Sequence, residues 1–458
     1  MIGASVPSLD ATSASPNGHA ATTGAARTGR PPGTPLPRGA QLAPWILRPG
    51  PTMRRWQRRY GDVFRAHIDP DHPWVIVADP DAVATIFRAG PEDVHAGEAN
   101  HILKPALGEN SVLCLDDDAH LRQRRLLLPP FHGERMQAYR DVMRDETERA
   151  LERMPRGVPF ALRDHTQAIT LEVIMRAVFG VTERGDLDRL RAVLATTVTW
   201  FGQPRNLVQQ VILGPEHPRV RAARRAHLDP LDEEIHRLIA ERRTAPDLAA
   251  REDVLSMLVL ARDEDGSAMS DTELRDELLT LLFAGHETTA TGLAWAFERM
   301  GRRPEVLERL TAEARSGAGT AYTDAVVKET LRLRPVVQIV VRRLLRDFDL
   351  AGWRVAAGET VAVSIYLMHR RPDLYPQPDA FAPERFLGAS PPGAYAWIPF
   401  GGGIRRCIGA SFAQVEMEVV LQTLVTNGRF ETVGPSERPR RRAVTLVPER
   451  GGQVVLMS

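Results

Sequence analysis

A long helix in the second half of the chain constrains the fold most. Ser270-Asp271-Thr272-Glu273 has the spacing of a capping box, in which a serine and a glutamate three residues later satisfy each other's free backbone amides. The helical pattern continues to Met300, and Gly301 follows as a terminator. A helix of about 30 residues is about 45 Å long. Because residues 278–283 are apolar on nearly every side, we expect this helix to run through the core of a large domain.

The next six residues of this helix break the rules of a core helix. They read Ala284-Gly285-His286-Glu287-Thr288-Thr289. A glycine in the middle of a helix costs about 1 kcal/mol relative to alanine. A carboxylate and hydroxyls in a buried helix also need polar partners. Departures of this kind tend to mark functional or strained sites, so we expect one here.

The remaining pattern predicts an α+β fold in which helix is the majority. Helical periodicity dominates residues 118–330, and a final helix is expected over about 410–426. Asp79-Pro80 predicts a capped helix that extends to about Arg88. The other expected elements are strands at 63–68 and 74–77 around a turn, short strands between 347 and 365, and a loop rich in proline and glycine at 370–409.

Composition excludes several classes of protein. The 458 residues have a formal net charge of +1, which argues against nucleic-acid binding by bulk electrostatics. Two cysteines, Cys114 and Cys407, cannot form a disulfide framework or an all-cysteine zinc site, and they fit a reducing cytosol. No apolar run is long enough to span a membrane, and no signal peptide is evident, so we expect a cytoplasmic protein.

The first 40 residues differ in composition from the rest. They are rich in small residues and proline and have few groups that could build a core. We therefore expect a disordered tail over 1–40 and one domain over 41–458. A transit peptide is the alternative interpretation of the tail.

A glycine-rich loop around Cys407 is the strongest chemical motif. Residues 400–409 read Phe-Gly-Gly-Gly-Ile-Arg-Arg-Cys-Ile-Gly, directly before the final helix. Glycine allows a backbone to approach a ligand closely, and a helix N-terminus favours a thiolate. Arg405 is suited to a carboxylate of the same ligand. The alternative, that Cys407 is only a small buried side chain, does not explain these neighbours.

Two further segments could form an ion network. Glu329 and Arg332 are three residues apart on one helical face, so their side chains can pair. Pro335 ends that helix and directs the chain into an extended segment. A proline-rich loop at 376–386 contains Arg385, which could join the pair.

In this order and spacing, these segments resemble the cytochrome P450 family from about Trp45 onward. The shared motifs are Phe-x-x-Gly-x-Arg-x-Cys-x-Gly, the upstream Glu-x-x-Arg, the intervening Pro-Glu-Arg-Phe, and Ala-Gly-x-Glu-Thr-Thr on the long helix. The resemblance implies a single P450 domain, with the long central helix over the haem and a small β-sheet lobe. It also implies that Cys407 is the thiolate ligand of the iron of haem b.

The resemblance assigns roles to further residues. Glu287 and Thr288 look like the acid–alcohol pair that delivers protons during oxygen activation. Glu329, Arg332 and Arg385 would form a structural ion network. The implied haem contacts are Phe400, Gly401, Arg405, Cys407 and Gly409 around the loop, with His120, Arg124, Ala284, Gly285 and Arg342 elsewhere. A solvated basic face is the alternative for His120 and Arg124, and Arg343 is the alternative to Arg342.

The implied activity is that of a haem-thiolate monooxygenase that hydroxylates or epoxidises a small molecule with O₂. No flavin or iron–sulfur motif is evident, so the resemblance implies ferredoxin and an NAD(P)H-dependent ferredoxin reductase as electron donors. A basic face of Arg122, Arg125, Arg405 and Arg406 could attract an acidic donor. The alternatives are a peroxide-using peroxygenase or isomerase of the same fold and a non-catalytic haem-binding protein.

The substrate pocket is expected to be mostly apolar. By analogy with the family, it is lined by Leu282, Phe283, His286, Val336, Val337, Gln338 and Ile339. The substrate would then be hydrophobic, such as a terpene, a fatty acyl chain or a polyketide of secondary metabolism. Trp200 and Phe201 could belong to a lid, and Cys114 is expected only to pack. We expect a monomer with no nucleic-acid or membrane partner.

Overall fold

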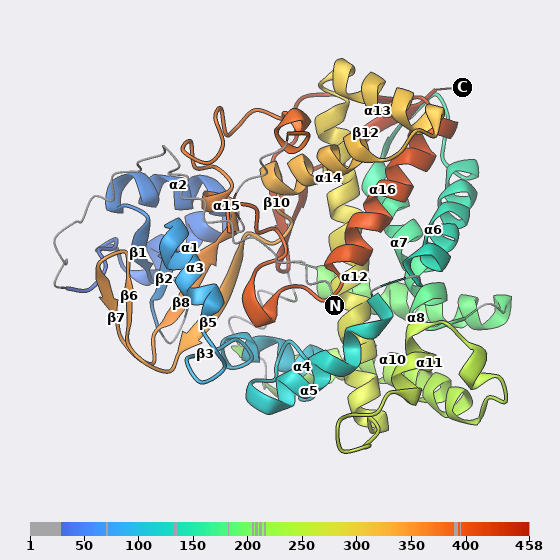
Figure 1. Ribbon diagram of the computed structural model, residues 1–458, viewed down its shortest axis with the longest axis horizontal. Helices are drawn as coiled ribbons and strands as arrows, with labels where there is room; N and C mark the ends of the chain where they lie inside the picture. The colour runs from blue at the N-terminus through green and yellow to red at the C-terminus, as the bar shows by residue number, and fades with distance from the viewer. Residues whose placement is uncertain are drawn as a thin grey trace, which may run out of the picture.

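The computed structural model describes residues 29–457, except 70–71, 132, 134, 182, 204–205, 207–208, 210–212, 215–216, 389–392 and 394. A small lobe built around a β-sheet lies beside a larger helical lobe (Figure 1). This mainly helical α+β arrangement confirms the predicted fold class.

The sheet lobe joins the beginning and the later part of the chain. Its five strands lie in the order β1-β2-β8-β5-β3, in which only the β2–β8 pair is parallel. The described elements of this lobe are α1 (Arg38–Leu47), α2 (Pro49–Tyr60), β1 (Val63–Ala66), β2 (Trp74–Val77), α3 (Pro80–Arg88), β3 (Val94–His95), β5 (Ile339–Leu344), β8 (Thr360–Ser364) and α15 (Ile365–Met368). A two-stranded hairpin of β6 (Phe348–Leu350) and β7 (Trp353–Val355) lies beside it (Figure 1).

Two local predictions in this lobe are confirmed. The first strands pair as an antiparallel hairpin with Val63 opposite Val77. Helix α3 begins at Pro80, and the Asp79 side chain accepts hydrogen bonds from the backbone N–H groups of Asp81 and Ala82. The aspartate therefore caps the helix as its position before proline indicates.

The helical lobe holds most of the remaining chain. Its described helices are α4 (Lys104–Leu107), α5 (Asp117–Leu127), α6 (Arg135–Glu152), α7 (Leu162–Ala177), α8 (Arg184–Gly202), α10 (Pro218–Thr244), α11 (Val254–Leu260), α12 (Asp271–Met300), α13 (Pro304–Ser316), α14 (Ala321–Leu333) and α16 (Ala410–Asn427). Short 3₁₀ turns, η1 (Glu98–Leu103), η2 (Pro129–Phe131), η3 (Leu248–Ala250), η4 (Pro383–Phe386) and η5 (Gly403–Arg405), link these helices.

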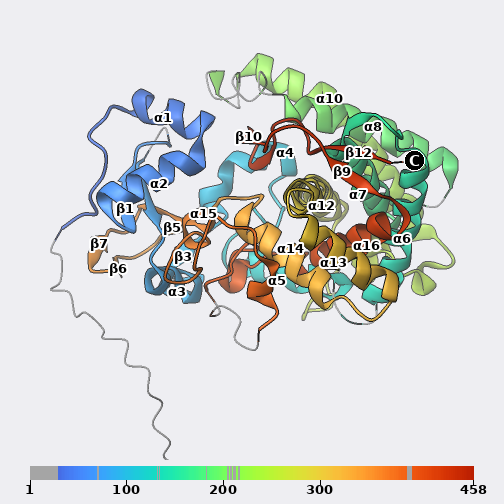
Figure 2. The same cartoon turned by 90° about the horizontal axis from the view of Figure 1, so that it is seen from above.

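Helix α12 is the predicted central helix. It has 30 residues, and Ser270 and Glu273 form the expected capping box. Figure 2 shows it end-on, with other helices on several sides. Gly301 ends the helix with an ordinary φ of −65°, not the left-handed conformation of a typical glycine terminator. The long helix therefore runs through the interior as expected.

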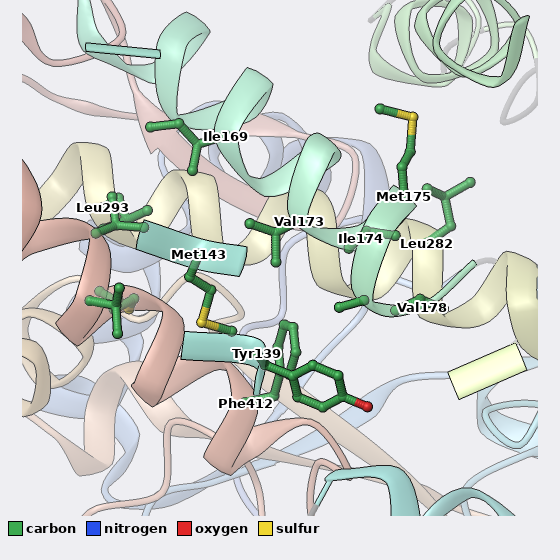
Figure 3. Packing of buried hydrophobic residues seen from close by; sticks show 14 of the residues in the cluster. Tyr139, Met143, Ile169, Val173, Ile174, Met175, Val178, Leu282, Leu293 and Phe412 are labelled. Carbon is green, nitrogen blue, oxygen red and sulfur yellow. The ribbon is translucent and has the colours of Figure 1, made fainter. Parts of the chain in front are cut away.

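The core of the helical lobe forms where α6, α7, α12 and α16 meet (Figure 3). Met143, Val173 and Leu293 are fully buried there. The rings of Tyr139 and Phe412 pack edge to face with centroids 5.4 Å apart. This contact fixes the first turn of α16, which directly follows the Cys407 loop.

The C-terminal strands were not predicted. β12 (Gln453–Leu456) lies between β4 (Pro159–Ala161) and β9 (Phe430–Thr432), while β10 (Pro439–Arg442) pairs with β11 (Thr445–Pro448). Each has only three or four residues, and β10 is rich in arginine. Such short segments have too little alternation to indicate a strand.

The boundary predicted at residue 40 lies inside an ordered segment. Residues 1–28 are outside the described part of the chain. Within the described part, Gly33 bridges to Arg65, Pro32 accepts a backbone hydrogen bond from the same residue, and α1 begins at Arg38. Residues 32–40 are therefore not a disordered tail, and the single domain over the rest stays a prediction. No helix among the described residues is long and apolar enough to cross a membrane.

Candidate active site

The Cys407 loop is shaped by glycines that press against α3. Gly401 and Gly403 have φ values of 70° and 66°, which glycine adopts without strain. A Cβ on Gly402 would lie 2.3 Å from the Phe87 ring, and one on Gly403 would lie 2.0 Å from the Phe87 carbonyl oxygen. The loop therefore needs glycine for its close contact with the sheet lobe.

The side chain of Cys407 is exposed. Its backbone N–H donates to the carbonyl of Phe400 at 3.0 Å, which closes the loop. The side chain is open to a solvent-sized molecule, yet surrounding protein raises the pKa of its thiol. The Gly409 N–H, Arg124 and Arg406 oppose this shift. A coordinated cation would overcome the remaining cost and hold the thiolate.

A buried basic cluster lies close to Cys407. His120 is 2% exposed, and burial together with Arg405, Arg124 and Arg342 lowers its pKa to about 3. Burial and Arg405 lower the pKa of Arg342 to about 10. The mutual effects show that these four side chains, far apart in sequence, meet at one place.

This cluster lacks enough negative charge. Arg405 pairs with Asp116 at 2.5 Å. Within the described chain, the side chains of Arg124 and His120 have no hydrogen-bond or ion-pair partner, and Arg342 donates only to the carbonyl of Val341. Buried cations need anionic partners, so the cluster is suited to a ligand with carboxylates, such as the two haem propionates.

The structure distinguishes between the alternatives at this cluster. Arg342 is buried and lines a small pocket with Phe87 and Arg405. Arg343 instead points to Glu98, with N and O atoms 3.4 Å apart. Because His120 is also buried, a solvated basic face does not describe this cluster.

Arg405 also holds the loop at 112–116. Its guanidinium donates to the carbonyl oxygens of Val112 and Leu115 at 3.1 and 2.5 Å. Its carboxylate partner Asp116 accepts in turn from three successive backbone N–H groups at 96–98. Arg405 therefore fixes the wall of the site, a task that the motif alone did not indicate.

On α12, Ala284 and Thr288 share one face. Ala284 is exposed although the helix runs through the interior, so there is open space beside it. The Thr288 hydroxyl donates to the Ala284 carbonyl at 2.6 Å and is only half-buried. This bond uses the hydroxyl proton but leaves the oxygen able to accept another hydrogen bond.

Gly285 does not face the same open space. A Cβ there would lie 3.0 Å from the Ile174 side chain of α7. Gly285 therefore allows α12 to pack closely on α7. Gly285 as a haem contact through its backbone stays a prediction.

Glu287 is held by two residues of α7. Its two carboxylate oxygens accept from Arg163 at 2.5 Å and from Gln167 at 2.8 Å. The carboxylate is therefore fixed by an ion pair and an amide, next to the hydroxyl of Thr288. Sequence reasoning missed both partners because they lie more than a hundred residues away.

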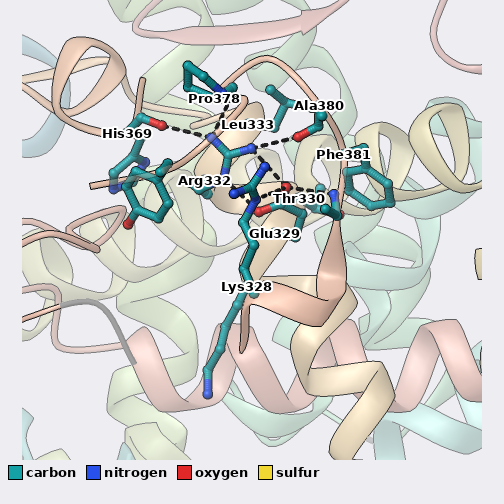
Figure 4. A network of polar contacts seen from close by, with 12 residues as sticks. Lys328, Glu329, Thr330, Arg332, Leu333, His369, Pro378, Ala380 and Phe381 are labelled. Atoms are coloured by element: carbon teal, nitrogen blue, oxygen red, sulfur yellow. Dashed lines mark hydrogen bonds and ion pairs between the residues drawn. The ribbon is translucent and has the colours of Figure 1, made fainter. Parts of the chain in front are cut away.

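The predicted ion network joins the C-terminal part of α14 to the loop that contains Arg385 (Figure 4). Glu329 and Arg332 are both fully buried and form two hydrogen bonds of 2.6 and 2.8 Å. Arg332 also donates to the carbonyls of His369, Pro378 and Ala380. Arg385 approaches Glu329 at 3.5 Å. The pair therefore ties the loop at 369–385 to the helix.

Several residues expected in the substrate pocket lie elsewhere. Leu282 is fully buried against the core, as Figure 3 shows, and His286 is 4% exposed. Val336 belongs to the main core, Ile339 packs in the sheet lobe, and Gln338 is buried. On α12, positions 282 and 286 lie nearly opposite Ala284. Phe283, Val337 and Ile339 are half-buried, and their place in the substrate pocket stays a prediction.

The predicted lid and the second cysteine can be placed in part. Trp200 is 8% exposed and packs on His227 with ring centroids 5.4 Å apart, whereas the Phe201 side chain lies outside the described residues.

Cys114 is buried, and burial raises the pKa of its thiol to about 11. It is therefore an unreactive packing residue.

The expected basic face is smaller than predicted. Arg122 pairs with Asp263 and Glu273 at 2.6 Å, and Arg125 pairs with Glu264. Arg405 is part of the buried cluster. Only Arg406 stays exposed without a carboxylate partner in the described part of the chain.

Two buried carboxyl groups near the site were not anticipated. Glu277 is fully buried, accepts from the Val112 N–H at 2.8 Å, and has a pKa well above its ordinary value because of burial. Burial likewise raises the pKa of Glu416, which contacts Thr289, to about 8. Both carboxyl groups connect α12 to the elements around it.

Comparison with known proteins identifies the family. The family model described as Cytochrome P450 matches residues 31–456. Cytochrome P450 135B1 of Mycobacterium tuberculosis is 41% identical over 446 residues, covering 94% of this chain and 92% of that protein. Cytochrome P450 137 of the same organism is 37% identical and covers 93% and 91%.

Solved cytochrome P450 structures have the same fold as this chain. A cyanobacterial CYP120A1 with retinoic acid bound has a TM-score of 0.79 and 25% identity, covering 94% of this chain and 99% of that chain. The haem domain of cytochrome P450DA has a TM-score of 0.81 and 23% identity, covering 94% and 98%. With the Cys407 loop and the unbalanced basic cluster, these findings show that the chain belongs to the cytochrome P450 family of haem-thiolate monooxygenases.

Proposed function

We propose that this monooxygenase hydroxylates or epoxidises a hydrophobic small molecule, of terpene, fatty acyl or polyketide type, in the cytoplasm. Electrons would come from NAD(P)H through a ferredoxin reductase and a ferredoxin. The overall reaction consumes O₂, two electrons and two protons, and yields oxidised substrate and water. The observation that supports it is the single face of α12 on which exposed Ala284 lies beside the Thr288 hydroxyl, with Glu287 held at the next position.

In this proposal Cys407 would hold the haem iron, and His120, Arg124 and Arg342 would hold the propionates. When bound, the haem supplies the oxygen activation that is characteristic of thiolate-ligated iron. The protein supplies a shaped wall, a fixed thiolate position and a proton path.

The proton path would begin at Glu287. Its carboxylate is oriented by Arg163 and Gln167, and in this proposal it would pass a proton toward the active-site face as a general acid–base group. Thr288 would pass the proton on by turning its hydroxyl away from the Ala284 carbonyl. Positioned acids and alcohols of this kind raise rates by roughly 10²–10⁴-fold.

The open face of α12 supports the proposed substrate class. Ala284 presents only a methyl group, and the neighbouring candidates Phe283 and Val337 are apolar. A hydrophobic ligand is favoured by such a wall because polar groups would lose hydrogen bonds on entry. A compound library screened for a Soret shift on binding would identify the substrate.

The electron donor is proposed from charge. Exposed Arg406 lies next to Cys407 and would attract an acidic ferredoxin. Arg406→Glu should slow reduction by ferredoxin and reduce its dependence on salt, while Arg406→Lys, which keeps the positive charge, should not.

The experiment that tests the proton path is Thr288→Val, which is nearly isosteric. We expect NAD(P)H consumption to continue while product per NAD(P)H falls about tenfold or more and hydrogen peroxide accumulates. Thr291→Val is the matched control, one helical turn further along a buried stretch of α12. Unchanged coupling in Thr288→Val would contradict the path and favour a peroxide-using enzyme.

A further inference from the structure

An apolar helix face lies open at the N-terminal side of the sheet lobe. Helix α1 buries only Gln41 and Trp45. Its solvent side and the residues just before it include Leu36, Ile46 and Leu47, which are 53%, 45% and 73% exposed. A helix with apolar residues on both sides is normally buried on both sides. In α1, the side that carries Ile46 and Leu47 faces outward.

The turn between β10 and β11 adjoins this helix. Helix α1 contacts β10, and the guanidinium of Arg441 lies over the Trp45 ring, 5.8 Å from its centroid. Val444, in the turn after β10, is 62% exposed. The exposed aliphatic side chains therefore belong to neighbouring elements.

The same region is strongly basic. Residues 38–61 contain no aspartate or glutamate. Among the described residues, a group of arginines on or next to α1, α2 and β10 has no carboxylate partner, namely Arg38, Arg48, Arg55, Arg58, Arg59, Arg438 and Arg440. Surface arginines elsewhere are commonly paired, as Arg191 is with Glu172 and Asp188. The open aliphatic face is thus flanked by charge that the protein does not neutralise.

We propose that α1, α2 and the β10–β11 turn form a docking surface for an anionic phospholipid bilayer. Ile46 and Leu47 would enter the boundary between headgroups and acyl chains, and the arginines of α2 and β10 would contact lipid phosphates. Exposed aliphatic residues flanked by arginine are typical of elements that lie in a membrane interface. This surface attachment replaces the expectation that the chain has no membrane partner, and it requires no spanning helix.

The charge of this surface favours an anionic lipid bilayer as its partner. Arginines close to a negatively charged leaflet are attracted to it. Trp45 and Trp56 stack on each other with centroids 6.3 Å apart and are both less than a tenth exposed, so they anchor α1 to α2. The exposed aliphatic chains and guanidinium groups beside them fit a bilayer whose surface is negatively charged.

The test is co-sedimentation of the haem-loaded full chain with vesicles at low salt. We expect binding to vesicles of equal parts phosphatidylglycerol and phosphatidylcholine, weak binding to phosphatidylcholine alone, and release by added salt. The triple variant Arg55→Gln, Arg58→Gln, Arg59→Gln should bind about a hundredfold more weakly, since each arginine near an anionic surface contributes about fivefold.

A second variant tests the aliphatic contribution. Ile46→Ser with Leu47→Ser should weaken binding by about tenfold for each side chain removed from the bilayer. Leu260→Ser is the matched control, because Leu260 is 43% exposed at the end of α11 in the helical lobe, away from α1 (Figure 1). An unchanged ferrous–CO spectrum shows that each variant is folded.

Four results would overturn the proposal. The first is no binding to anionic vesicles, and the second is equal binding to neutral ones. The third is a dimer in light scattering that Ile46→Ser with Leu47→Ser dissociates, which would assign the face to a second copy of the chain. The fourth is binding only after deletion of residues 1–28, which would assign the face to that segment.

Discussion

Removing the carboxylate of Glu329 should destabilise the protein strongly. Glu329→Ala leaves Arg332, which is fully buried, without its two carboxylate contacts of 2.6 and 2.8 Å. It also leaves the Ala382 N–H without its acceptor, which in the wild type is a Glu329 carboxylate oxygen 2.8 Å away. Breaking a buried ion pair by removing one partner costs about 3–5 kcal/mol. The remaining carbonyl partners of Arg332 accept hydrogen bonds but do not neutralise its charge.

This cost converts into a measurable change in melting temperature. A chain of 458 residues has an unfolding entropy of about 1 kcal/mol/K near its midpoint, so the expected fall is about 3–5 °C. Calorimetry or circular dichroism of the haem-loaded protein measures it, and haem content after purification should fall as well.

The matched control is Asp141→Ala. Asp141 and Arg144 have the same spacing of three residues and a contact of 2.8 Å, but both are about half exposed. An exposed pair contributes about 0–1 kcal/mol, so this variant should melt within about 1 °C of the wild type. If Glu329→Ala melted as high as Asp141→Ala and kept its full haem content, the reasoning about the buried pair would be refuted.

Two further predictions concern charged groups near the site. Arg124→Gln should release haem to apomyoglobin about tenfold or more faster, because a charge-assisted hydrogen bond contributes about 1.5–3 kcal/mol, whereas Arg343→Gln should change the rate little. Equal rates in both variants would contradict the propionate assignment. Burial raises the pKa of Glu416 from 4.5 to about 8. Between pH 4.5 and pH 8, the carboxyl group therefore keeps its proton in the folded protein and loses it in the unfolded chain. Its stabilising effect is complete below pH 4.5 and is lost as the pH rises toward 8, by about 1.4 kcal/mol per pH unit. Glu416→Gln should flatten this dependence of the unfolding free energy, and an unchanged slope would show that Glu416 is ionised in the fold.

Local sequence signals predicted the features that depend on neighbouring residues. The capping box of Ser270 and Glu273, the Asp79 cap and the Glu329–Arg332 pair all join residues within four positions of one another. Their partners are therefore visible in a short window of sequence. The glycines before Cys407 were predicted to allow close approach to a ligand, whereas the structure shows that Gly402 and Gly403 lie close to Phe87 of α3.

Long-range partners could not be predicted in the same way. Glu287 is paired with Arg163 from another helix, and Arg405 with Asp116, because the tertiary fold brings these helices and loops together. The burial of Leu282 could not be predicted either, since the all-apolar stretch at 278–283 has no polar side that indicates which face points outward. Sequence indicated which residues matter, and packing decides which way each one points.

The coordination of iron by Cys407 is the central claim, and the ferrous–CO spectrum tests it most directly. Cys407 is exposed and interacts electrostatically with Arg124, whereas Cys114 is buried with a thiol pKa raised to about 11. Cys407→Ala should lose the red-shifted Soret band that thiolate ligation gives, and Cys114→Ala should keep it. Retention of that band by Cys407→Ala would contradict the account.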